Sequence, residues 1–337
     1  MNGFVAEHRA AGDVQRIPGF KSNRGMALLV VLAIVALLTS LLTELAFSTL
    51  VDLRLTETFR DTTRAYYLAK GGITAGRMIL QDDRNHYDGL DELWSQGVIN
   101  YPVHDGSITV RIIDQDGKLG VNALVSGNTP SALMVDRFYR LFVALELDDL
   151  ADPAELTANL IDWLDSGNAP YTQILTGGAA IPVSGAEDAY YQGLRPPYPT
   201  KNGRLDTLDE LSLIKGFTPE VLRRVLPHVG LHDLVAVNIN TASAAVLKAL
   251  DPLVDDAVAA TLIAYRQETP IEALTQLDGV IPPGAYSALK SLGNLEQLGV
   301  RSRSYRIEAE AEVNDGRRRL QAEVDKRDNR LLLLKVN

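Results

Sequence analysis

Oxygen-bearing side chains gather in two short segments near a stretch rich in Gly, Pro and Tyr. The first segment carries Asp162, Asp165 and Asn168, and the second carries Glu187 and Asp188. Ca²⁺ takes about six to eight oxygen ligands from carboxylates, carbonyls and water, often on flexible loops, so these residue types suit it. The spacing is not that of an EF-hand loop. The alternative is a solvated acidic loop in which Asp165 only caps a turn.

Other catalytic and metal-binding signatures are missing from the sequence. The chain has no Cys, which excludes disulfides, zinc–thiolate sites, Fe–S clusters and thiol catalysis. It has no Gly-x-Ser-x-Gly, P-loop or Rossmann fingerprint. His228 and His232 lack the intervening Glu of a His-Glu-x-x-His zinc motif, and Pro227 and Gly230 indicate a helix end. We therefore expect no enzymatic activity.

A third motif concerns nucleic acid. Residues 237–243 read Val-Asn-Ile-Asn-Thr-Ala-Ser and resemble the start of a helix-hairpin-helix unit, and residues 264–266 fit its later part. The DNA-binding form uses a Gly-rich hairpin whose backbone N–H groups meet phosphates. Here residues 250–256 read Leu-Asp-Pro-Leu-Val-Asp-Asp, without Gly and with three Asp, and the net charge is −10. We expect a structural helical hairpin and no nucleic-acid partner.

The elements that must position these residues begin with a membrane segment. Residues 26–43 are 18 residues without charge, of which 15 are apolar. As a helix they span roughly 27 Å, close to the thickness of a bilayer's hydrocarbon core. Lys21 and Arg24 precede this run and Glu44 follows it, which predicts a cytoplasmic N-terminus and an external body. A buried core helix and a cleaved secretory signal peptide are the alternatives.

The helical pattern continues well beyond the membrane segment. No proline occurs between Pro18 and Pro102, and apolar residues mix with charged ones after the uncharged run. We expect one helix over residues 26–81. The glycines inside it are weak points or close-packing positions; they are Gly71, Gly72 and Gly76.

Alternating apolar and polar residues predict strands at both ends of the body. Residues 107–114 alternate, and Asp116-Gly117 indicates a hairpin turn into a strand through Leu119 and Val121. Residues 305–313 also alternate, Asp315-Gly316 is a second turn signal, and a last strand covers residues 331–336. With Asp315-Gly316 as a two-residue turn, the expected cross-strand pairs are Ala311 with Leu320, Ala309 with Ala322, Ile307 with Val324 and Glu312 with Arg319.

Between these strands lie helices whose starts carry capping signals. The expected starts are Thr129-Pro130, Asp152-Pro153, Thr207, Thr218-Pro219 and Thr269-Pro270. Residues 174–200 are rich in Gly, Pro and Tyr and are expected to form a loop.

The N-terminal residues carry a family resemblance. Lys21-Ser22-Asn23-Arg24-Gly25 is followed at once by Met26-Ala27-Leu28-Leu29-Val30, which resembles a type IV prepilin signal. The resemblance implies cleavage between Gly25 and Met26 by prepilin peptidase, which then methylates the new N-terminus. Such proteins usually carry Glu at the fifth mature position, where this chain has Val30. The general secretion pathway protein K family lacks that Glu, and residues 64–72 and 237–242 are also similar to it.

This resemblance implies an α+β fold in which a long N-terminal transmembrane helix packs on a small antiparallel sheet, with a large inserted α-helical domain. The implied domains are a prepilin leader, a transmembrane helix, a pilin-like helix with the first strands, the inserted domain with helix-hairpin-helix-like units, and the C-terminal strands. Their bounds are 1–25, 26–48, 49–124, 125–300 and 301–337.

The resemblance also implies a function. The family consists of minor pseudopilins of the type II secretion system, which cap the pseudopilus tip and support export of folded proteins across the outer membrane. Implied partners are the minor pseudopilins of types I, J and H, the major pseudopilin, prepilin peptidase and the inner membrane, with the body in the periplasm. Calcium in the α-domain is implied through the acidic segments. A minor pilin of a type IV pilus and a membrane-anchored enzyme are the alternatives.

Overall fold

The structure is a computed structural model that describes residues 24–336, so residues 1–23 of the expected leader lie outside the described part. The chain divides into two compact units, residues 1–59 and residues 60–337. Helix α1 (Arg24–Asp82) belongs to both, which confirms the expected single long helix. The bounds expected at residues 124/125 and 300/301 stay predictions, because the second unit contains both of them.

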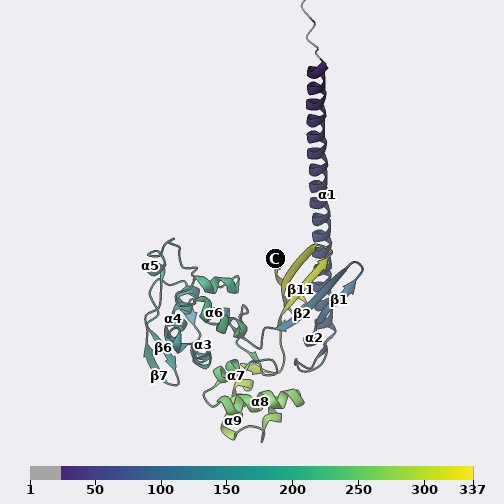
Figure 1. The fold of residues 1–337 in the computed structure, drawn as a ribbon. Coiled ribbons are helices and arrows are strands. Elements are labelled where there is room, and N and C mark those ends of the chain that lie inside the picture. Colours follow the sequence, from purple (N-terminus) through teal and green to yellow (C-terminus); the bar gives the residue numbers. More distant parts are fainter. Residues whose placement is uncertain (1–23, 337) are drawn as a thin grey trace, which may run out of the picture. The chain divides into compact units, whose positions relative to one another are not determined.

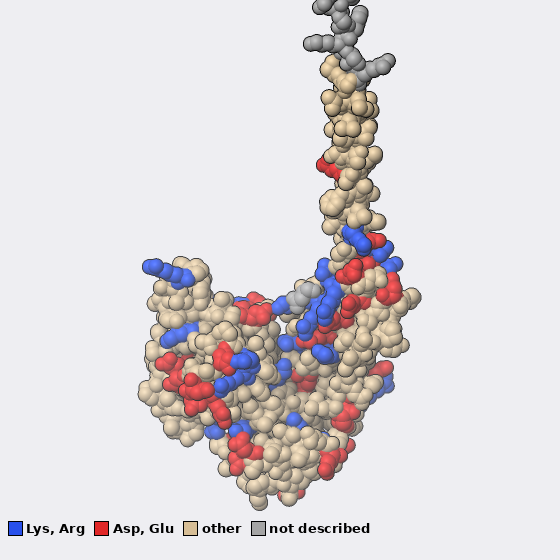
Figure 2. All heavy atoms as spheres, in the orientation of Figure 1, with Lys and Arg blue, Asp and Glu red and all other residues tan. Residues whose placement is uncertain are grey.

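The N-terminal part of α1 forms the described portion of the first unit. Residues 25–56 are all exposed, and α1 is long and apolar enough to cross a membrane. The hydroxyls of Thr39, Thr43 and Thr49 each donate to the carbonyl four residues earlier, at 2.7–2.8 Å, so their polar groups are satisfied within the helix. Figure 2 shows this part of the helix as almost free of charged side chains. These properties fit a single membrane anchor.

The second unit is built on a five-stranded antiparallel sheet with the order β1-β2-β11-β12-β13 (Figure 1). Its strands are β1 (Val98–Val103), β2 (Gly106–Asp114), β11 (Ser304–Val313), β12 (Gly316–Asp325) and β13 (Arg330–Val336). Strands β2 and β11 are neighbours although they lie far apart in the sequence. The chain therefore leaves the sheet after β2, forms every intervening element, and returns at β11.

Two glycines allow α1 to lie close to this sheet. A Cβ added at Gly72 would lie 2.6 Å from Ile108 Cδ1, and one at Gly76 would lie 2.9 Å from Ile307 Cγ2. Gly71 is exposed with nothing within 4 Å, and α1 continues unbroken through all three glycines. Gly72 and Gly76 are thus close-packing positions. The buried core of this layer contains Ala69, Ile73, Leu80, Trp94, Ile108, Val110, Ile112, Tyr305, Ile307, Ala309, Ala311, Leu320, Ala322 and Val324.

The residues between β2 and β11 have a separate, larger hydrophobic cluster that runs from Leu119 to Leu298. Its helices are α3 (Ala132–Ala144), α4 (Pro153–Leu164), α5 (Asp188–Tyr191), α6 (Pro219–Val225), α7 (Ala244–Leu250), α8 (Asp256–Glu268) and α9 (Pro283–Asn294). Its short strands are β3 (Leu119–Gly120), β4 (Val125–Ser126), β5 (Thr129–Pro130), β6 (Gln173–Thr176), β7 (Ala179–Pro182), β8 (Val229–Gly230), β9 (Val237–Asn238) and β10 (Leu298–Gly299). Helix α2 (Leu93–Gln96) precedes the first strand of the sheet, β1, in the sequence.

Several expected helix starts are confirmed by their caps. Asp152 accepts from the N–H of Ala154 at the start of α4, and Thr218 accepts from the N–H of Val221 at the start of α6. Thr207 and Glu210 form the expected capping box, although the element that follows, Leu208–Leu213, is a 3₁₀-helix. These signals are local, because each cap is a contact within one helical turn.

Other local expectations were wrong. Helix α3 is capped by Ser131, since Thr129 and Pro130 pair with β4 instead. Thr269 ends α8 and no helix begins there. Residues 174–200 are not all loop, because β6 and β7 form a hairpin and α5 follows it.

The expected hairpin at Asp116-Gly117 was also wrong. Strand β3 pairs in parallel with β8, and the carboxylate of Asp116 accepts from the N–H groups of Arg303 and Ser304. The Asp116-Gly117 turn therefore leads the chain out of the sheet and into the inserted elements. An Asp-Gly pair is compatible with a hairpin and with other turns, so tertiary contacts decided which of them forms.

The C-terminal hairpin exists, but its expected register was wrong by two residues. Ala309 lies opposite Leu320 and Ile307 opposite Ala322, because the turn consists of Asn314 and Asp315. Asn314 takes the positive φ of 49°, and Gly316 is already the first residue of β12. A shift by two residues leaves each side chain on its expected face, so the buried alternation was still right.

Candidate functional site

The processing and assembly residues lie at the start of α1. Gly25, Met26 and Val30 are all helical and exposed, and a Cβ added at Gly25 would have nothing within 4 Å. No described side chain therefore packs on the expected cleavage point. Cleavage, methylation and the role of Val30 stay predictions.

The acidic segments meet at the end of α4. Asp162 lies in the last turn of α4 and is buried, and Asp165 is the C-cap residue. Asp162 Oδ1 accepts from the N–H of Tyr171 at 2.9 Å, whereas Asp162 Oδ2 is buried without a partner. Glu187, the residue before α5, is also buried, and neither of its carboxylate oxygens has a partner. Buried carboxylate oxygens without partners are costly, so this arrangement calls for a proton or a cation.

The pKa values of Asp162 and Glu187 are raised by burial and by the neighbouring negative charges. Burial, with the charge of Asp165 adding to it, raises the pKa of Asp162 to about 7. Burial, with the charges of Asp162 and Asp165, raises the pKa of Glu187 to about 7. The three residues therefore lie near enough to repel one another electrostatically. Gly185 has no side chain where a Cβ would overlap Asp162 Oδ2, so the loop can pass directly over this carboxylate.

The other two residues of the expected set are placed differently. Asp188 Oδ1 accepts from the N–H and hydroxyl of Thr200 at 2.8 and 2.9 Å, so this carboxylate is already used to hold the loop. Asn168 is exposed. The structure therefore places Asp162, Asp165 and Glu187 close enough for their charges to interact, although their oxygens do not all lie within 4.8 Å of one another, and it leaves Asp188 and Asn168 outside this group.

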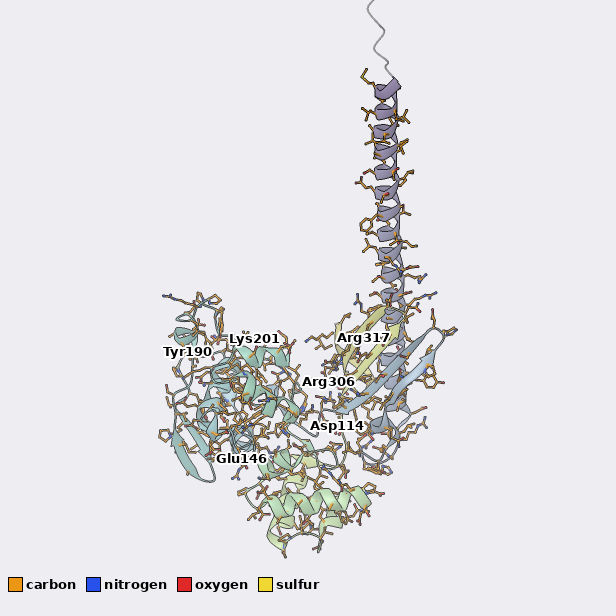
Figure 3. All side chains as sticks on the ribbon, in the orientation of Figure 1. Asp114, Glu146, Tyr190, Lys201, Arg306 and Arg317 are labelled. Carbon is orange, nitrogen blue, oxygen red and sulfur yellow. The ribbon has the colours of Figure 1, made fainter. Side chains whose placement is uncertain are left out.

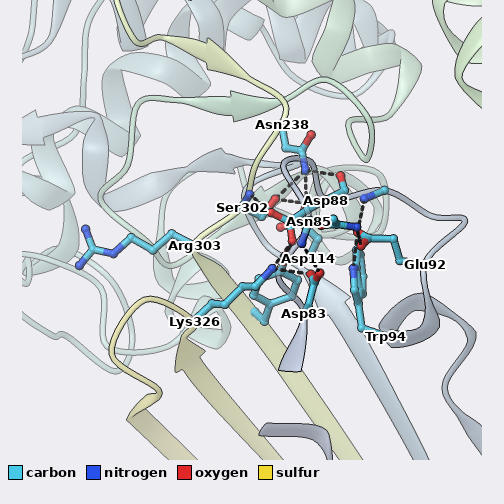
Figure 4. Close-up of polar contacts among 12 residues, drawn as sticks. Asp83, Asn85, Asp88, Glu92, Trp94, Asp114, Asn238, Ser302, Arg303 and Lys326 are labelled. Atoms are coloured by element: carbon cyan, nitrogen blue, oxygen red, sulfur yellow. Dashed lines mark hydrogen bonds and ion pairs between the residues drawn. The ribbon is translucent and has the colours of Figure 1, made fainter. Parts of the chain in front are cut away.

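A second acidic group was missed by sequence reasoning. Asp83, Asp88 and Glu92 place one carboxylate oxygen each within 4.8 Å of one another (Figure 4). Lys326, from just beyond β12, is 2.6 Å from Asp83 Oδ2 and also contacts Asp88 Oδ1. Although burial opposes it, the hydrogen bonds to Asp83 and Asp88 raise the pKa of Lys326. The ammonium group of Lys326 thus compensates part of the negative charge of this acidic group. Sequence reasoning missed the contact because Lys326 lies far from Asp83 and Asp88 along the chain.

Buried polar residues also surround the points where the chain leaves and re-enters the sheet. Asp114 is the last residue of β2 (Figure 3). Its Oδ2 accepts from the Ser302 hydroxyl at 2.7 Å and from Asn238 Nδ2 at 3.3 Å (Figure 4). Burial, with the charge of Asp116, raises the pKa of Asp114 to about 7. Burial raises the pKa of Asp116 to about 6. This network ties the end of β2 to the end of β9 and to the residues before β11.

That network also explains the helix-hairpin-helix-like motif. Asn238 holds the junction, Asn240 exchanges hydrogen bonds with the backbone of Ile271, and Ser243 caps α7. Arg266 donates to the carbonyl of Ile239. The motif's polar side chains are thus engaged within the protein, which agrees with the expected structural role.

These features define a class: a protein whose N-terminal helix is long and apolar enough to cross a membrane, and whose body is an antiparallel sheet with a long helical insertion between two neighbouring strands. The family models described as "Type II secretion system (T2SS), protein K" match residues 117–232 and 237–298. The chain belongs to the type II secretion system protein K family, as the sequence predicted.

Relatives agree with this assignment over most of the chain. The type II secretion system protein K of Aeromonas hydrophila is 29% identical over 339 residues, covering 95% of this chain and 98% of the relative. That of Pectobacterium carotovorum is 30% identical over 313 residues, covering 87% and 89%. The fold is similar to a solved chain in the GspK-GspI-GspJ complex of enterotoxigenic Escherichia coli, with a TM-score of 0.58 and 17% identity, covering 86% of this chain and 99% of that one.

Proposed function

We propose that this protein is a minor pseudopilin that caps the pseudopilus tip of a type II secretion system and supports export of folded proteins. The observation that carries the proposal is the topology: a pilin-like helix and sheet, with every element from β3 to β10 inserted between the adjacent strands β2 and β11. The insertion has its own core and adds bulk that a repeating shaft subunit would have to accommodate along the whole filament. A terminal position removes that requirement.

Val30 supports the same position. Pilin-like helices are expected to bundle in an apolar filament core, where the charged N-terminus of one subunit needs a carboxylate from its neighbour. Val30 offers no carboxylate. The protein therefore cannot serve a subunit stacked above it, and at the tip it does not need to.

The proposal includes maturation and placement in the membrane. Prepilin peptidase cuts between Gly25 and Met26 and methylates Met26. The helix then anchors the protein in the inner membrane with its N-terminus in the cytoplasm and its body in the periplasm, as Lys21 and Arg24 before the apolar run favour.

The partners we propose are the I, J and H minor pseudopilins and the major pseudopilin. The solved structure with a similar fold is described as a complex of GspK with GspI and GspJ, which supports the first two. Co-purification of the full chain with its co-expressed I and J counterparts tests this directly. Loss of secreted enzymes on gene deletion, restored by the intact gene, tests the role. If deletion of the gene abolished pilus-dependent motility and left secretion intact, the protein would instead be a minor pilin of a type IV pilus. The family assignment argues against this alternative.

We also propose a Ca²⁺ site at the end of α4. The support for the site is that Asp162 Oδ2 and both oxygens of Glu187 are buried without hydrogen-bond partners, with Asp165 as a third carboxylate near them. Among residues 24–336 these three carboxylates do not form a group of oxygens within 4.8 Å of one another, so Ca²⁺ binding would have to draw them together. Bound Ca²⁺ would supply the positive charge that this group lacks and join the end of α4 to the start of α5. Asp188 supports the loop from outside the site through Thr200.

A further inference from the structure

The edge strand β13 carries apolar side chains on the same face of the sheet that α1 packs against over the neighbouring strands. Cross-strand partners share a face, and here the pairs are Leu331 with Val324, Leu334 with Ala322 and Val336 with Leu320. The three β12 residues are at most 1% exposed, whereas Leu331, Leu334 and Val336 are 40%, 36% and 50% exposed. We call these three exposed side chains the β13 shelf. Because β12 is buried there and β13 is not, the cover over the sheet ends before its edge.

One cation borders the β13 shelf from α1. Arg77 donates from Nε to Asn329 Oδ1 at 3.0 Å and from Nη2 to the Asn329 carbonyl at 2.6 Å, which places it at the turn between β12 and β13. Lys70 precedes Arg77 by seven residues, close to two helical turns, so it lies on the same side of α1. Lys70 is exposed.

Another cation borders the β13 shelf from β12. Arg318 lies two residues before Leu320, and side chains two apart on a strand share a face. It is half-buried, and its guanidinium donates to the carbonyl of Arg317. Val336, opposite Leu320, is therefore its diagonal neighbour on β13.

These three cations differ from those on the opposite face of the sheet. Within residues 24–336, no carboxylate is paired with Lys70, Arg77 or Arg318. On the opposite face, Arg306 pairs with Glu323 at 2.7 Å, and Arg319 likewise pairs with Glu308. Among residues 24–336 the charges beside the β13 shelf therefore have no carboxylate partner, and the apolar side chains next to them are exposed.

We infer that the β13 shelf binds a neighbouring pseudopilin through apolar side chains flanked by Asp or Glu. The inference rests on the proposed function, which supplies the neighbouring subunits. Charge complementarity selects the partner's chemistry, because carboxylates would neutralise the three cations while apolar groups cover the shelf. Covering it also hides an apolar edge strand, a surface that otherwise favours unwanted pairing.

Site-directed crosslinking tests the inference, and the chain has no Cys to interfere. Leu334→Cys and Lys70→Cys, each in the full chain co-expressed with the other pseudopilins, would carry a maleimide photocrosslinker. Leu253→Cys is the matched control, because Leu253 is 54% exposed and lies between α7 and α8. We expect adducts with an identified pseudopilin about fivefold or more above the control. Adducts with a second copy of this chain, or pseudopilin adducts no stronger than the control's, overturn the inference.

Charge reversal provides an independent measurement. We expect Lys70→Glu with Arg318→Glu to lower co-purification of the other pseudopilins about tenfold. The introduced carboxylates would repel the partner's Asp and Glu, which the native cations attract. Lys290→Glu with Arg301→Glu makes the same charge change at exposed positions in α9 and before β11, outside the β13 shelf, and should change co-purification less than about twofold. If the unaltered chain retains no pseudopilin, the proposed function fails and the inference falls with it. If the unaltered chain and both double variants retain them equally, the inference alone fails.

Discussion

Gly316 lies so close to the backbone of Asp61 that a Cβ added at Gly316 would stand 2.6 Å from the Asp61 carbonyl oxygen. The first residue of β12 thus rests directly on α1, at the end of the helix–sheet contact nearest the hairpin turn. Asp61 is itself buried, and its carboxylate accepts from Asn314 in that turn. The glycine is required by this close approach, and the turn itself is made by its two predecessors.

Gly316→Ala should therefore destabilise the folded protein by about 1–3 kcal/mol, because the helix or the hairpin must shift to admit the methyl group. Gly71→Ala is the control: Gly71 is exposed in the same helix with open space around it, and alanine there should stabilise by up to about 1 kcal/mol. Denaturant unfolding of the purified full chain measures both. Equal effects of the two substitutions would contradict the packing argument.

Lys326→Met should cost about 3–5 kcal/mol, because it leaves Asp88, which is 1% exposed, and Asp83 without their cation. Adding Asp88→Asn to that variant should recover part of the loss by removing one of the two charges. Lys335→Met provides the comparison: Lys335 pairs with Asp209 at 2.6 Å on the surface, and its loss should cost under about 1 kcal/mol. The contrast fails if both lysine variants unfold at the same denaturant concentration.

The stability of the calcium-free protein should fall as the pH rises. Asp162 and Glu187 have folded-state pKa values raised to about 7, so between about pH 4 and 7 the folded state binds more protons than the unfolded state. Stability from these groups is present at low pH and is lost as the pH rises through 7, on the order of 4 kcal/mol at most for Asp162. Melting in EDTA between pH 5 and 8 measures this, and Asp162→Asn should make the slope smaller, while the part of the slope due to Glu187, Asp114 and Asp116 remains.

Calcium should reverse that trend. Its ligands must be ionised, so the melting temperature gained on adding Ca²⁺ should grow as the pH rises through 7. Mg²⁺ should give a smaller gain, since its octahedral geometry suits this group of carboxylates poorly. Asp162→Asn or Glu187→Gln should remove the gain, whereas Asp188→Asn should keep it, because Asp188 holds Thr200 instead. A melting temperature indifferent to Ca²⁺ at pH 8 would refute the site.

Gly25→Leu should block processing while leaving membrane insertion intact, because the apolar run that follows is unchanged. N-terminal sequencing of membrane-extracted protein should begin at a methylated Met26 in the unaltered chain. An intact Met1 in cells with active prepilin peptidase would show that the leader is not a prepilin signal.

Val30→Glu distinguishes a terminal position from one inside the shaft. At the tip no subunit needs the added carboxylate, so secretion and filament assembly should stay within about twofold of the unaltered chain. Within the shaft the substitution would restore a missing partner for the next subunit's N-terminus. A clear rise in assembled filament would therefore count against the tip position.

The sequence by itself determined the features that depend on neighbouring residues. The uncharged run at residues 26–43 predicts a membrane helix, and Asp152 and Thr218 mark helix starts, because a cap needs only its own first turn. Strand alternation also placed Ile307 and Ala309 in the core, since side-chain direction repeats every two residues. The family motifs, read the same way, led to the protein K family.

Only the tertiary structure decided which distant groups meet. The structure places the β11–β12 turn at Asn314 and Asp315 with Gly316 against α1, and no local turn signal contains that contact with the helix. Lys326 reaches Asp88 across most of the chain, and Asp162 loses solvent only when the loop at Gly185 passes over it. Whether a carboxylate is buried, and which cation lies beside it, depends on contacts between residues that are far apart in the sequence. Local sequence patterns do not specify those contacts.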